Sequence, residues 1–477
     1  MDDKELEHHG RFSLDELPGG STVHFVGAGG AGMSAIATVL LQMGYKVEGS
    51  DLKESSYVRR LRDLGASVGI GHRAGNVGAC EVVVRSSAIR SDNPEIVEAV
   101  RRGLPVISRA QMLAAIMETR RGIAVAGTHG KTTTSSLVTC MLGGCGADPS
   151  YLIGGELNET GSNAHYGTGE FIVAEADESD GSLLYLRPEV VVLTNIDWDH
   201  LDYFDSPEHT ARVFRKFLEV IPLDGFAAIC GDDPRALEVG TDYRRSGGRV
   251  VFYGKDSGSD YAFEVVERDA AGMSFSVSGP DGEIALMRTN LPGLHNAYNA
   301  LAAIAVGCEL KLPLDRIASG IENCPGVRRR FEEVGEHGGI RVIDDYAHHP
   351  TEVKAVMEIA TNLEAERVVA VFQPHRYTRT RLLSKQFGES FDGAGLVVVA
   401  DVYGAGEDPE PGVTGKLVAD SILEHDPDME VAYFESRADL ARGVVGLLEP
   451  GDVVITMGAG DVTQCGREIL DLLGSEG

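Results

Sequence analysis

The sequence predicts an α/β protein of three domains, and three observations support that fold class. The chain has 477 residues, whereas a typical domain has roughly 150. Short apolar runs alternate with helix-period stretches from end to end, which is typical of parallel sheets covered by helices. Two glycine-rich turns, at residues 27–32 and 127–130, each follow an apolar run. Two different sheets are therefore expected to carry such a turn.

The first domain is expected over residues 1–120, as strands alternating with helices. Apolar runs predict its strands at 21–27, 45–51, 80–87 and 104–109. Apolar residues at helical spacing predict its helices at 33–44, 57–65 and 94–103.

The second domain is expected over residues 121–325, and a basic stretch at 325–331 marks the linker to the third, at 326–477. The second domain opens with a strand at 122–127 and a helix after Lys131, followed by strands at 170–177 and 189–197, an antiparallel hairpin over 261–279 turning at Ala271–Gly272, and a helix at 295–310. The third has expected strands at 340–347, 367–375, 395–403, 429–434 and 452–460.

Charge and cysteine usage exclude several classes of protein. The formal charge is −30, which would repel a nucleic-acid backbone. The seven cysteines are scattered and form no C-x-x-C pair, which favours reduced thiols over a disulfide or zinc framework. The polar, acidic N-terminus and the lack of a long apolar run argue against membrane insertion. We expect a cytoplasmic protein.

The first glycine turn, GAGGAG, matches G-x-G-x-x-G at Gly27, Gly29 and Gly32, and Asp51 closes the next expected strand. Bare backbone lets a diphosphate approach amides at the positive end of a helix. NAD is one candidate ligand, and any other diphosphate linked to a ribose would also suit the turn. The alternative is a tight structural turn without a ligand.

The second turn, GTHGKTT, is a shortened relative of the phosphate-binding P-loop, with two residues between Gly127 and Gly130 where the common pattern has four. Lys131 is expected to contact the β- and γ-phosphates, and the Thr132 hydroxyl to bind Mg²⁺. The alternative is an ordinary strand-to-helix turn. With two such turns, one is expected to hold the energy source and the other the substrate.

Acidic clusters follow two expected strands of the second domain, in VAEADESD and NIDWDH. Glu175 and His200 are the candidate ligands for divalent cations, although Mg²⁺ prefers oxygen ligands over imidazole. Two metal ions would neutralise charge on both the phosphoryl group and its acceptor. The alternative is that these loops are merely solvated.

Polar residues open two further expected helices. His295 and Asn296 stand at the start of one, where Asn296 is either a helix cap or an adenine contact. His375, Arg376, Arg379 and Arg381 fall within seven residues at the start of the other. So many cations in an acidic chain favour an anion site over a solvated helix start, because Arg offers a bidentate fork to a carboxylate.

The chain resembles the Mur ligases of peptidoglycan synthesis over nearly its whole length. The resemblance is carried in family order by GAGGAGMSAIA, GTHGKTTT, EADESDGS, NIDWDHLDYF, PGLHNAYNA, DDYAHHPTEV and FQPHRYTRTRLL. It implies an N-terminal Rossmann-like domain for a UDP-linked substrate, a central ATPase domain, and a C-terminal Rossmann-like domain that completes the ATP site and receives an amino acid. The short P-loop is the family's own form.

The branch most resembled joins L-alanine to UDP-N-acetylmuramate through an acyl phosphate, as a monomer or weak homodimer. ATP and two Mg²⁺ ions, with Mn²⁺ as a possible substitute, are the implied cofactors. Within the family, a ligase that joins a whole tripeptide to the same sugar nucleotide is the nearest alternative. Outside it, a nicotinamide oxidoreductase and a nucleotide-dependent switch protein are the alternatives.

The resemblance also implies roles for single residues. Lys131, His348 and His375 are the catalytic candidates, with either histidine as the general base, and Thr132, Glu175 and His200 are the metal ligands. ATP contacts are implied for Gly127, Thr128, Gly130, Lys131, Thr132, Thr133, His295, Asn296, Arg328, Arg329 and Asp345. Contacts to the sugar nucleotide or the amino acid are implied for Gly27, Gly29, Gly30, Gly32, Asp51, Ser86, His129, Glu178, Ser179, His375, Arg376 and Arg379.

Overall fold

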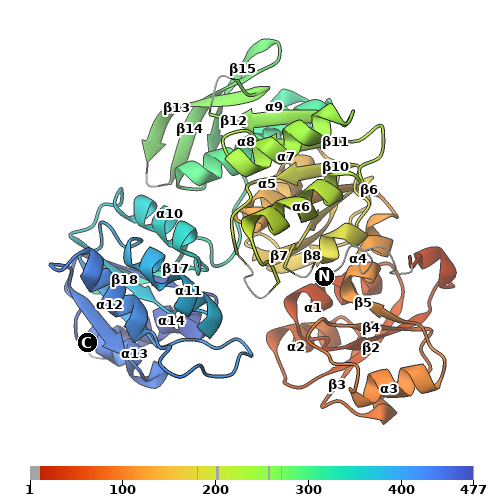
Figure 1. Cartoon of the computed structure of the whole chain (residues 1–477), viewed down its shortest axis with the longest axis horizontal. Coiled ribbons are helices and arrows are strands. Elements are labelled where there is room, and N and C mark those ends of the chain that lie inside the picture. The colour runs from red at the N-terminus through yellow and green to blue at the C-terminus, as the bar shows by residue number, and fades with distance from the viewer. Residues whose placement is uncertain (1–10, 180, 200–202, 256–257, 270, 476–477) are drawn as a thin grey trace.

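Three α/β units, each built on its own sheet, make up the chain (Figure 1). The computed structural model describes residues 11–179, 181–199, 203–255, 258–269 and 271–475. The expected three-unit α/β architecture is confirmed. In Figure 1 the central unit lies at the top, the N-terminal unit at the lower right and the C-terminal unit at the lower left. No helix in the described part of the chain is long and apolar enough to cross a membrane.

The N-terminal unit has a parallel sheet in the order β3-β2-β1-β4-β5. Its central strands are buried on both faces, which suits their runs of valine. Its elements are η1 (Leu14–Glu16), β1 (Thr22–Val26), α1 (Ala31–Gln42), β2 (Lys46–Asp51), α2 (Ser56–Asp63), β3 (Ser67–Ile70), η2 (Ala74–Asn76), β4 (Val82–Arg85), α3 (Pro94–Arg101), β5 (Val106–Ser108) and α4 (Arg109–Met117).

The central unit has a ten-stranded sheet in the order β15-β14-β13-β12-β11-β10-β6-β9-β7-β8. Strands β9, β6, β10, β11 and β12 are parallel neighbours, and β13, β14 and β15 form an antiparallel extension. Its elements are β6 (Arg121–Ala126), α5 (Lys131–Gly144), β7 (Ser150–Leu157), β8 (Ser162–His165), β9 (Phe171–Glu175), η3 (Ser182–Tyr185), β10 (Val190–Leu193), α6 (Pro207–Leu218), β11 (Phe226–Cys230), α7 (Pro234–Arg245), β12 (Val250–Gly254), β13 (Tyr261–Asp269), β14 (Gly272–Gly279), β15 (Gly282–Thr289), α8 (Leu294–Glu309) and α9 (Leu314–Glu322).

The C-terminal unit has a sheet in the order β16-β17-β21-β18-β19-β20, in which only the edge pair β16 and β17 is antiparallel among the described strands. Its elements are β16 (Glu332–His337), β17 (Ile340–Asp345), α10 (Pro350–Ala360), β18 (Arg367–Phe372), α11 (Tyr377–Gly388), β19 (Leu396–Ala400), α12 (Lys416–His425), β20 (Val431–Phe434), α13 (Arg437–Val445), β21 (Asp452–Met457), η4 (Asp461–Gln464) and α14 (Cys465–Ser475).

Strand ends place the polar loops of the three sheets. In a parallel α/β sheet, ligands bind beyond the carboxyl ends of the strands, because loops and helix N-termini gather there. The lysine turn follows β6, the two acidic clusters follow β9 and β10, and the histidine-rich loop follows β17. All seven cysteines are free thiols in the structure.

Candidate active site

The first glycine turn is supported by Asp51, the last residue of β2. The Gly29 N–H donates a hydrogen bond to Asp51 Oδ2 at 2.8 Å. A Cβ on Gly29 would come within 2.9 Å of that oxygen and of the Val58 side chain, so only glycine fits. α1 begins at Ala31, immediately after the turn, and Ala31 lines the large cleft between the units.

The lysine turn holds a buried cation at the start of α5. Lys131 Nζ donates to the Gly127 carbonyl at 2.6 Å and to Glu178 Oε2 at 2.8 Å. Burial acts to lower the pKa of Lys131, but the nearby carboxylates of Glu178, Asp177 and Glu175 together outweigh it and raise that pKa above its usual range. Lys131 is therefore a permanent positive charge beside the N-terminus of α5, where an anionic phosphate is favoured.

Glu175 and Thr132 form a group of oxygen donors beside Lys131. The Thr132 hydroxyl donates to Glu175 Oε2 at 2.8 Å, and the Gly154 N–H donates to the same oxygen at 2.8 Å. A carboxylate and a hydroxyl are ligands that Mg²⁺ accepts, so the residues present fit a hard divalent cation. His200, the third expected ligand, lies outside the described residues.

A cleft of about 930 Å³ is lined by residues of all three units. The N-terminal unit contributes Ala31 and Tyr57, and the central unit contributes the lysine turn with Glu175. The C-terminal side contributes His348 and the arginines Arg328, Arg329 and Arg330. Because the walls come from separate units, a ligand that spans the cleft would favour their closure.

A second cavity, of about 530 Å³, lies beside the lysine turn and is lined by Thr133, His295, Asn296 and Asp345. Burial lowers the pKa of His295 to about 4, so this ring is neutral at pH 7. Burial also raises the pKa of Asp345 to about 6. The cavity therefore combines apolar walls with a neutral imidazole and a carboxylate, which suit a nucleobase and the hydroxyls of its ribose.

Asn296 does not cap its helix. The N-cap of α8 is Gly293, and Asn296 instead donates to the Pro292 carbonyl at 2.6 Å and accepts from Asn299 at 3.0 Å. The helix begins earlier than a cap at Asn296 would require, because Gly293 has a φ of 95°, which glycine adopts without strain. The capping alternative is therefore wrong.

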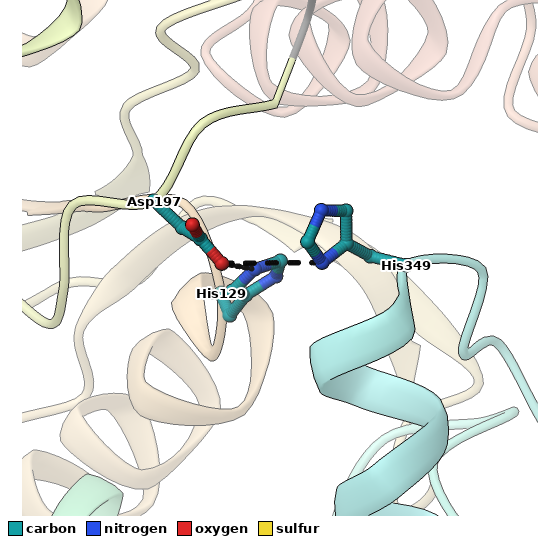
Figure 2. Close-up of side chains that lie close together, drawn as sticks. All are labelled: His129, Asp197 and His349. Atoms are coloured by element: carbon teal, nitrogen blue, oxygen red, sulfur yellow. Dashed lines mark hydrogen bonds and ion pairs between the residues drawn. The ribbon is translucent and has the colours of Figure 1, made fainter. Parts of the chain in front are cut away.

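His129 of the lysine turn connects the central unit to α10 of the C-terminal unit. Its Nε2 lies 3.3 Å from Asp197 Oδ2, and its Nδ1 lies 3.3 Å from Glu352 Oε1. Burial acts to lower the pKa of His129, but hydrogen bonds to the two carboxylates outweigh it and raise that pKa to about 9. Figure 2 shows His349, the N-cap residue of α10, beside His129 and Asp197.

Glu352 holds this junction together, and its replacement by glutamine is expected to raise the KM for ATP about 10-fold. The carboxylate accepts from His129 and also from the backbone N–H of His348 and of His349, at 3.0 and 3.3 Å. A hydrogen bond between charged groups contributes about 1.5 kcal/mol or more, and about 1.4 kcal/mol corresponds to a tenfold change in affinity. The measurement is the ATP dependence of phosphate release.

Glu358, an exposed carboxylate on the same helix, provides the matched control. Glu358→Gln should leave the KM for ATP unchanged. Equal KM values for the Glu352 and Glu358 variants would contradict a role for the junction in nucleotide binding.

His348 and His375 lie together, with ring centroids 5.7 Å apart, but they differ in tautomer. His348 Nδ1 lies 3.0 Å from the Tyr346 carbonyl, which can only accept, so Nδ1 carries the proton and Nε2 the lone pair. His375 Nδ1 accepts from Arg379 Nη1 at 3.2 Å, so its Nε2 carries the proton. Burial lowers the pKa of His348 to about 4 and that of His375 to about 3.

Arg379 forms a buried ion pair across the junction. Its Nη2 donates to Asp199 Oδ1 at 2.8 Å and to Oδ2 at 3.0 Å, and both side chains are 7% exposed. Asp199 follows β10 of the central unit, whereas Arg379 belongs to α11 of the C-terminal unit. The pair therefore fixes α11 against the loop that also carries Asp197.

Arg376 stands one residue before α11 with a φ of 69°, an unusual value for a residue with a side chain. Its N–H donates to the Tyr403 carbonyl at 2.8 Å, and its Nη1 lies 3.9 Å from Glu407. Such strain persists only where surrounding contacts hold it, and it clusters at functional sites.

The structure brings many of the expected site residues together and keeps others apart. Either or both of the two cavities are lined by Thr128, His129, Gly130, Lys131, Thr132, Thr133, Glu175, His295, Asn296, Arg328, Arg329, Asp345 and His348. The described residues that line these cavities do not include Gly27, Gly29, Gly30, Gly32, Asp51, Ser86, Gly127, Glu178, Ser179, His375, Arg376 and Arg379. Of these, Glu178 contacts Lys131, and His375 and Arg379 adjoin His348 and Asp199.

Sequence reasoning missed Asp197, Asp199 and Glu352 as parts of the site. Asp197 and Asp199 belong to the NIDWDH cluster, from which only His200 was selected. Glu352 completes a capping box with His349, and the glutamate three residues after that N-cap is the available signal.

Comparisons with known proteins match all three units. Residues 22–121 match the profile "Mur ligase family, catalytic domain", residues 125–307 match "Mur ligase middle domain", and residues 329–460 match "Mur ligase, glutamate ligase domain". The UDP-N-acetylmuramate--L-alanine ligase of Desulforamulus reducens is 46% identical over 94% of this chain and 97% of its own length. The enzyme of that name from Syntrophotalea carbinolica is 46% identical over 95% of this chain and 98% of its own.

The solved structures agree with these matches. The crystal structure of a UDP-N-acetylmuramate-alanine ligase from Thermotoga maritima has a TM-score of 0.81 and 28% identity, over 96% of this chain and 100% of that one. A murein peptide ligase from Psychrobacter arcticus, at 24% identity, has the same fold, with a TM-score of 0.71 over 95% of this chain and 99% of that one.

Proposed function

Since this chain belongs to the Mur ligase family, we propose that it joins L-alanine to the lactyl carboxylate of UDP-N-acetylmuramate, with conversion of ATP to ADP and phosphate. The observation that carries the proposal is the 930 Å³ cleft. It combines the lysine turn, an oxygen-rich cation site and a neutral histidine with walls from three units. This reaction is the first addition of an amino acid to the peptidoglycan precursor.

The three units divide the substrates among them. The N-terminal unit, residues 1–120, holds the UDP end at the Gly27–Gly32 turn. The central unit, 121–325, holds the ATP phosphates at Lys131, and its neighbouring 530 Å³ cavity takes the adenine. The C-terminal unit, 326–477, completes the ATP site through Asp345 and receives L-alanine beside His375 and Arg376. We propose that the protein acts as a monomer or weak homodimer.

A carboxylate does not react with an amine in water, because its oxygen is a poor leaving group. Phosphorylation by ATP converts the carboxylate into an acyl phosphate, a mixed anhydride, with release of ADP, and the attacking amine then expels phosphate. Lys131 supplies positive charge where two anions, the carboxylate and the γ-phosphate, must approach each other. Thr132, Glu175 and His200 would hold up to two Mg²⁺ ions, with Mn²⁺ as a substitute, which add further positive charge there.

His348 is the better placed of the two histidines to accept the proton of the alanine amine. A general base needs a lone pair within reach of the proton that it takes. His348 Nε2 carries that lone pair because its Nδ1 faces the Tyr346 carbonyl, whereas Arg379 already occupies the His375 lone pair. We therefore assign proton acceptance to His348 and positioning of Arg379 to His375.

An acyl phosphate hydrolyses in water, so the C-terminal unit should close over the cleft during the reaction. The junction contacts of Arg379 and Glu352 would hold that closed arrangement. Free thiols and dependence on ATP and a nucleotide sugar support a cytoplasmic location.

Phosphate release from ATP, measured with UDP-N-acetylmuramate and one acceptor at a time, tests the proposed specificity. L-Alanine should support release at a lower concentration than glycine or L-serine, and the tripeptide of the related recycling reaction should not. Release with the tripeptide alone would identify the chain as a tripeptide ligase. Release that is indifferent to every acceptor would indicate a nucleotide switch.

Arg376→Ala is expected to raise the KM for L-alanine by roughly 10- to 100-fold with a smaller change in kcat. A hydrogen bond to a charged group contributes about 1.5–3 kcal/mol. The carboxylate of L-alanine would contact Arg376 equally in the ground state and in the transition state, so loss of this contact should raise KM more than it lowers kcat. Initial rates over a range of L-alanine concentrations provide the measurement. A fall in kcat with an unchanged KM would instead place Arg376 in the phosphoryl-transfer step.

A further inference from the structure

Three side chains from two units converge at the junction in a pattern that the proposed ligation does not explain. His129 comes from the lysine turn, Asp197 from the loop after β10, and His349 from the N-cap of α10. Their candidate ligand atoms all lie within 4.8 Å of one another. Figure 2 shows that both rings direct a nitrogen towards the same carboxylate oxygen of Asp197.

The distances are close to those that a single metal ion requires. A tetrahedral ion with bonds of about 2.0–2.1 Å holds its ligand atoms about 3.4 Å apart. His129 Nε2 lies 3.3 Å from Asp197 Oδ2, and His349 Nδ1 lies 4.0 Å from the same oxygen. The three ligand atoms lie within 4.8 Å of one another, so an ion would draw the two imidazole nitrogens closer together.

The neighbours of these residues are of the kind that orients metal ligands. A histidine that binds a metal usually donates its other ring N–H to a carboxylate, which fixes the tautomer. His129 Nδ1 lies 3.3 Å from Glu352 Oε1, so Nε2 is the nitrogen that remains for the ion. The Thr351 hydroxyl donates to Asp197 Oδ2 at 3.1 Å and orients the carboxylate.

We propose that His129, Asp197 and His349 bind one divalent transition-metal ion of the Zn²⁺ and Co²⁺ class, with water in the remaining position. Two imidazoles and one carboxylate suit such ions, whereas Mg²⁺ selects sites made of oxygen alone. The site differs from the oxygen-rich group at Thr132 and Glu175. The 530 Å³ cavity, which His129 and Asp197 line, gives it access to solvent.

The ion would join the central unit to the C-terminal unit. In its absence, hydrogen bonds of His129 to Asp197 and Glu352 make the same connection. The ion takes the place of the proton on His129 Nε2, which is released to solvent. Metal binding therefore favours the closed arrangement and slows its reopening.

Co²⁺ titration, followed by visible absorption with Mg²⁺ in large excess, tests the site directly. A four-coordinate Co²⁺ ion with nitrogen ligands absorbs far more strongly than an octahedral ion with oxygen ligands, so the spectrum separates this site from the Glu175 site. The informative variants are His349→Asn and Asp197→Asn. Asparagine is a good N-cap, so His349→Asn preserves the start of α10 while it removes the imidazole.

The wild-type protein should develop the intense absorption with one Co²⁺ per chain, and Zn²⁺ should displace it. Each variant should weaken Co²⁺ binding at least 10-fold, since loss of even an outer partner of a metal ligand costs 10- to 100-fold. His165→Asn, which alters a half-buried histidine on β8 outside this cluster, should bind Co²⁺ like the wild type. Absence of the intense absorption, or its persistence in both cluster variants, would overturn the proposal.

Discussion

Lys131→Ala is expected to reduce phosphate release from ATP by about 100-fold or more, because it removes the buried positive charge that the lysine turn presents to the phosphates. Loss of one preorganised charge-stabilising group costs roughly 100- to 1,000-fold in turnover. Lys131 is held by two loop carbonyls and by Glu178, so its ammonium position is fixed before ATP binds. Single-turnover assays with saturating substrates measure the loss in the chemical step itself.

Lys354→Ala is the matched control, since Lys354 is an exposed lysine on α10. That variant should retain full activity. Full activity of Lys131→Ala would remove the central unit's lysine turn from the mechanism. A pure rise in the KM for ATP would reduce the role of Lys131 to binding.

Arg379→Met and Asp199→Asn are each expected to lower kcat/KM for L-alanine by roughly 100- to 1,000-fold, with the double variant no worse than the poorer single variant. Removal of one partner from a buried ion pair leaves an uncompensated charge and costs about 3–5 kcal/mol. The bidentate pair, with both side chains 7% exposed, meets this condition. Removal of both partners leaves no stranded charge, so the losses should not multiply.

The wild type, the two single variants and the double variant are compared by initial rates. Lys385→Met, at an exposed position on α11, is the control. The control should change activity little, because exposed charges contribute about 1 kcal/mol at most. Losses that multiply in the double variant would show that Arg379 and Asp199 act independently. The ion pair would then have no part in closure.

Several buried parallel strands of this fold could be predicted from the sequence because they are continuous apolar runs, whereas β11 (Phe226–Cys230) and β12 (Val250–Gly254), which are also buried at every position, were not predicted. β10, Val190–Leu193, and β19 are buried at every position, and β18 is buried at every position but its first. The hairpin was also predictable: β13 ends at Asp269, which pairs with Gly272 at the start of β14. Residue 270, between them, lies outside the described part of the chain.

Two edge strands, β3 and β16, and β7, which lies between β9 and β8, carried too weak a signal. β3, Ser67–Ile70, buries only Val68, and β16, Glu332–His337, has no buried residue. β7, Ser150–Leu157, is interrupted by Gly154 and Gly155, which weaken a strand pattern. Such strands depend on pairing with a neighbour, so a single-sequence pattern does not reveal them.

The local motifs of the site could be predicted, but its long-range contacts could not. The Lys131 turn is a pattern of neighbouring residues, whereas the Arg379–Asp199 pair joins positions 180 residues apart. The same limit applies to His129 and Glu352, which lie 223 residues apart. Residue chemistry alone indicated an anion site around Arg379, and the structure shows that Arg379 contacts the carboxylate of Asp199.

Transfer of ¹⁸O from a labelled lactyl carboxylate of UDP-N-acetylmuramate tests most directly whether this chain activates an acid with ATP. Phosphorylation places one carboxylate oxygen between carbon and phosphorus, and attack by the alanine amine expels that oxygen with phosphate. The account therefore predicts one ¹⁸O in each phosphate released and one in the new amide, as measured by mass spectrometry. Unlabelled phosphate formed together with the amide product would contradict it.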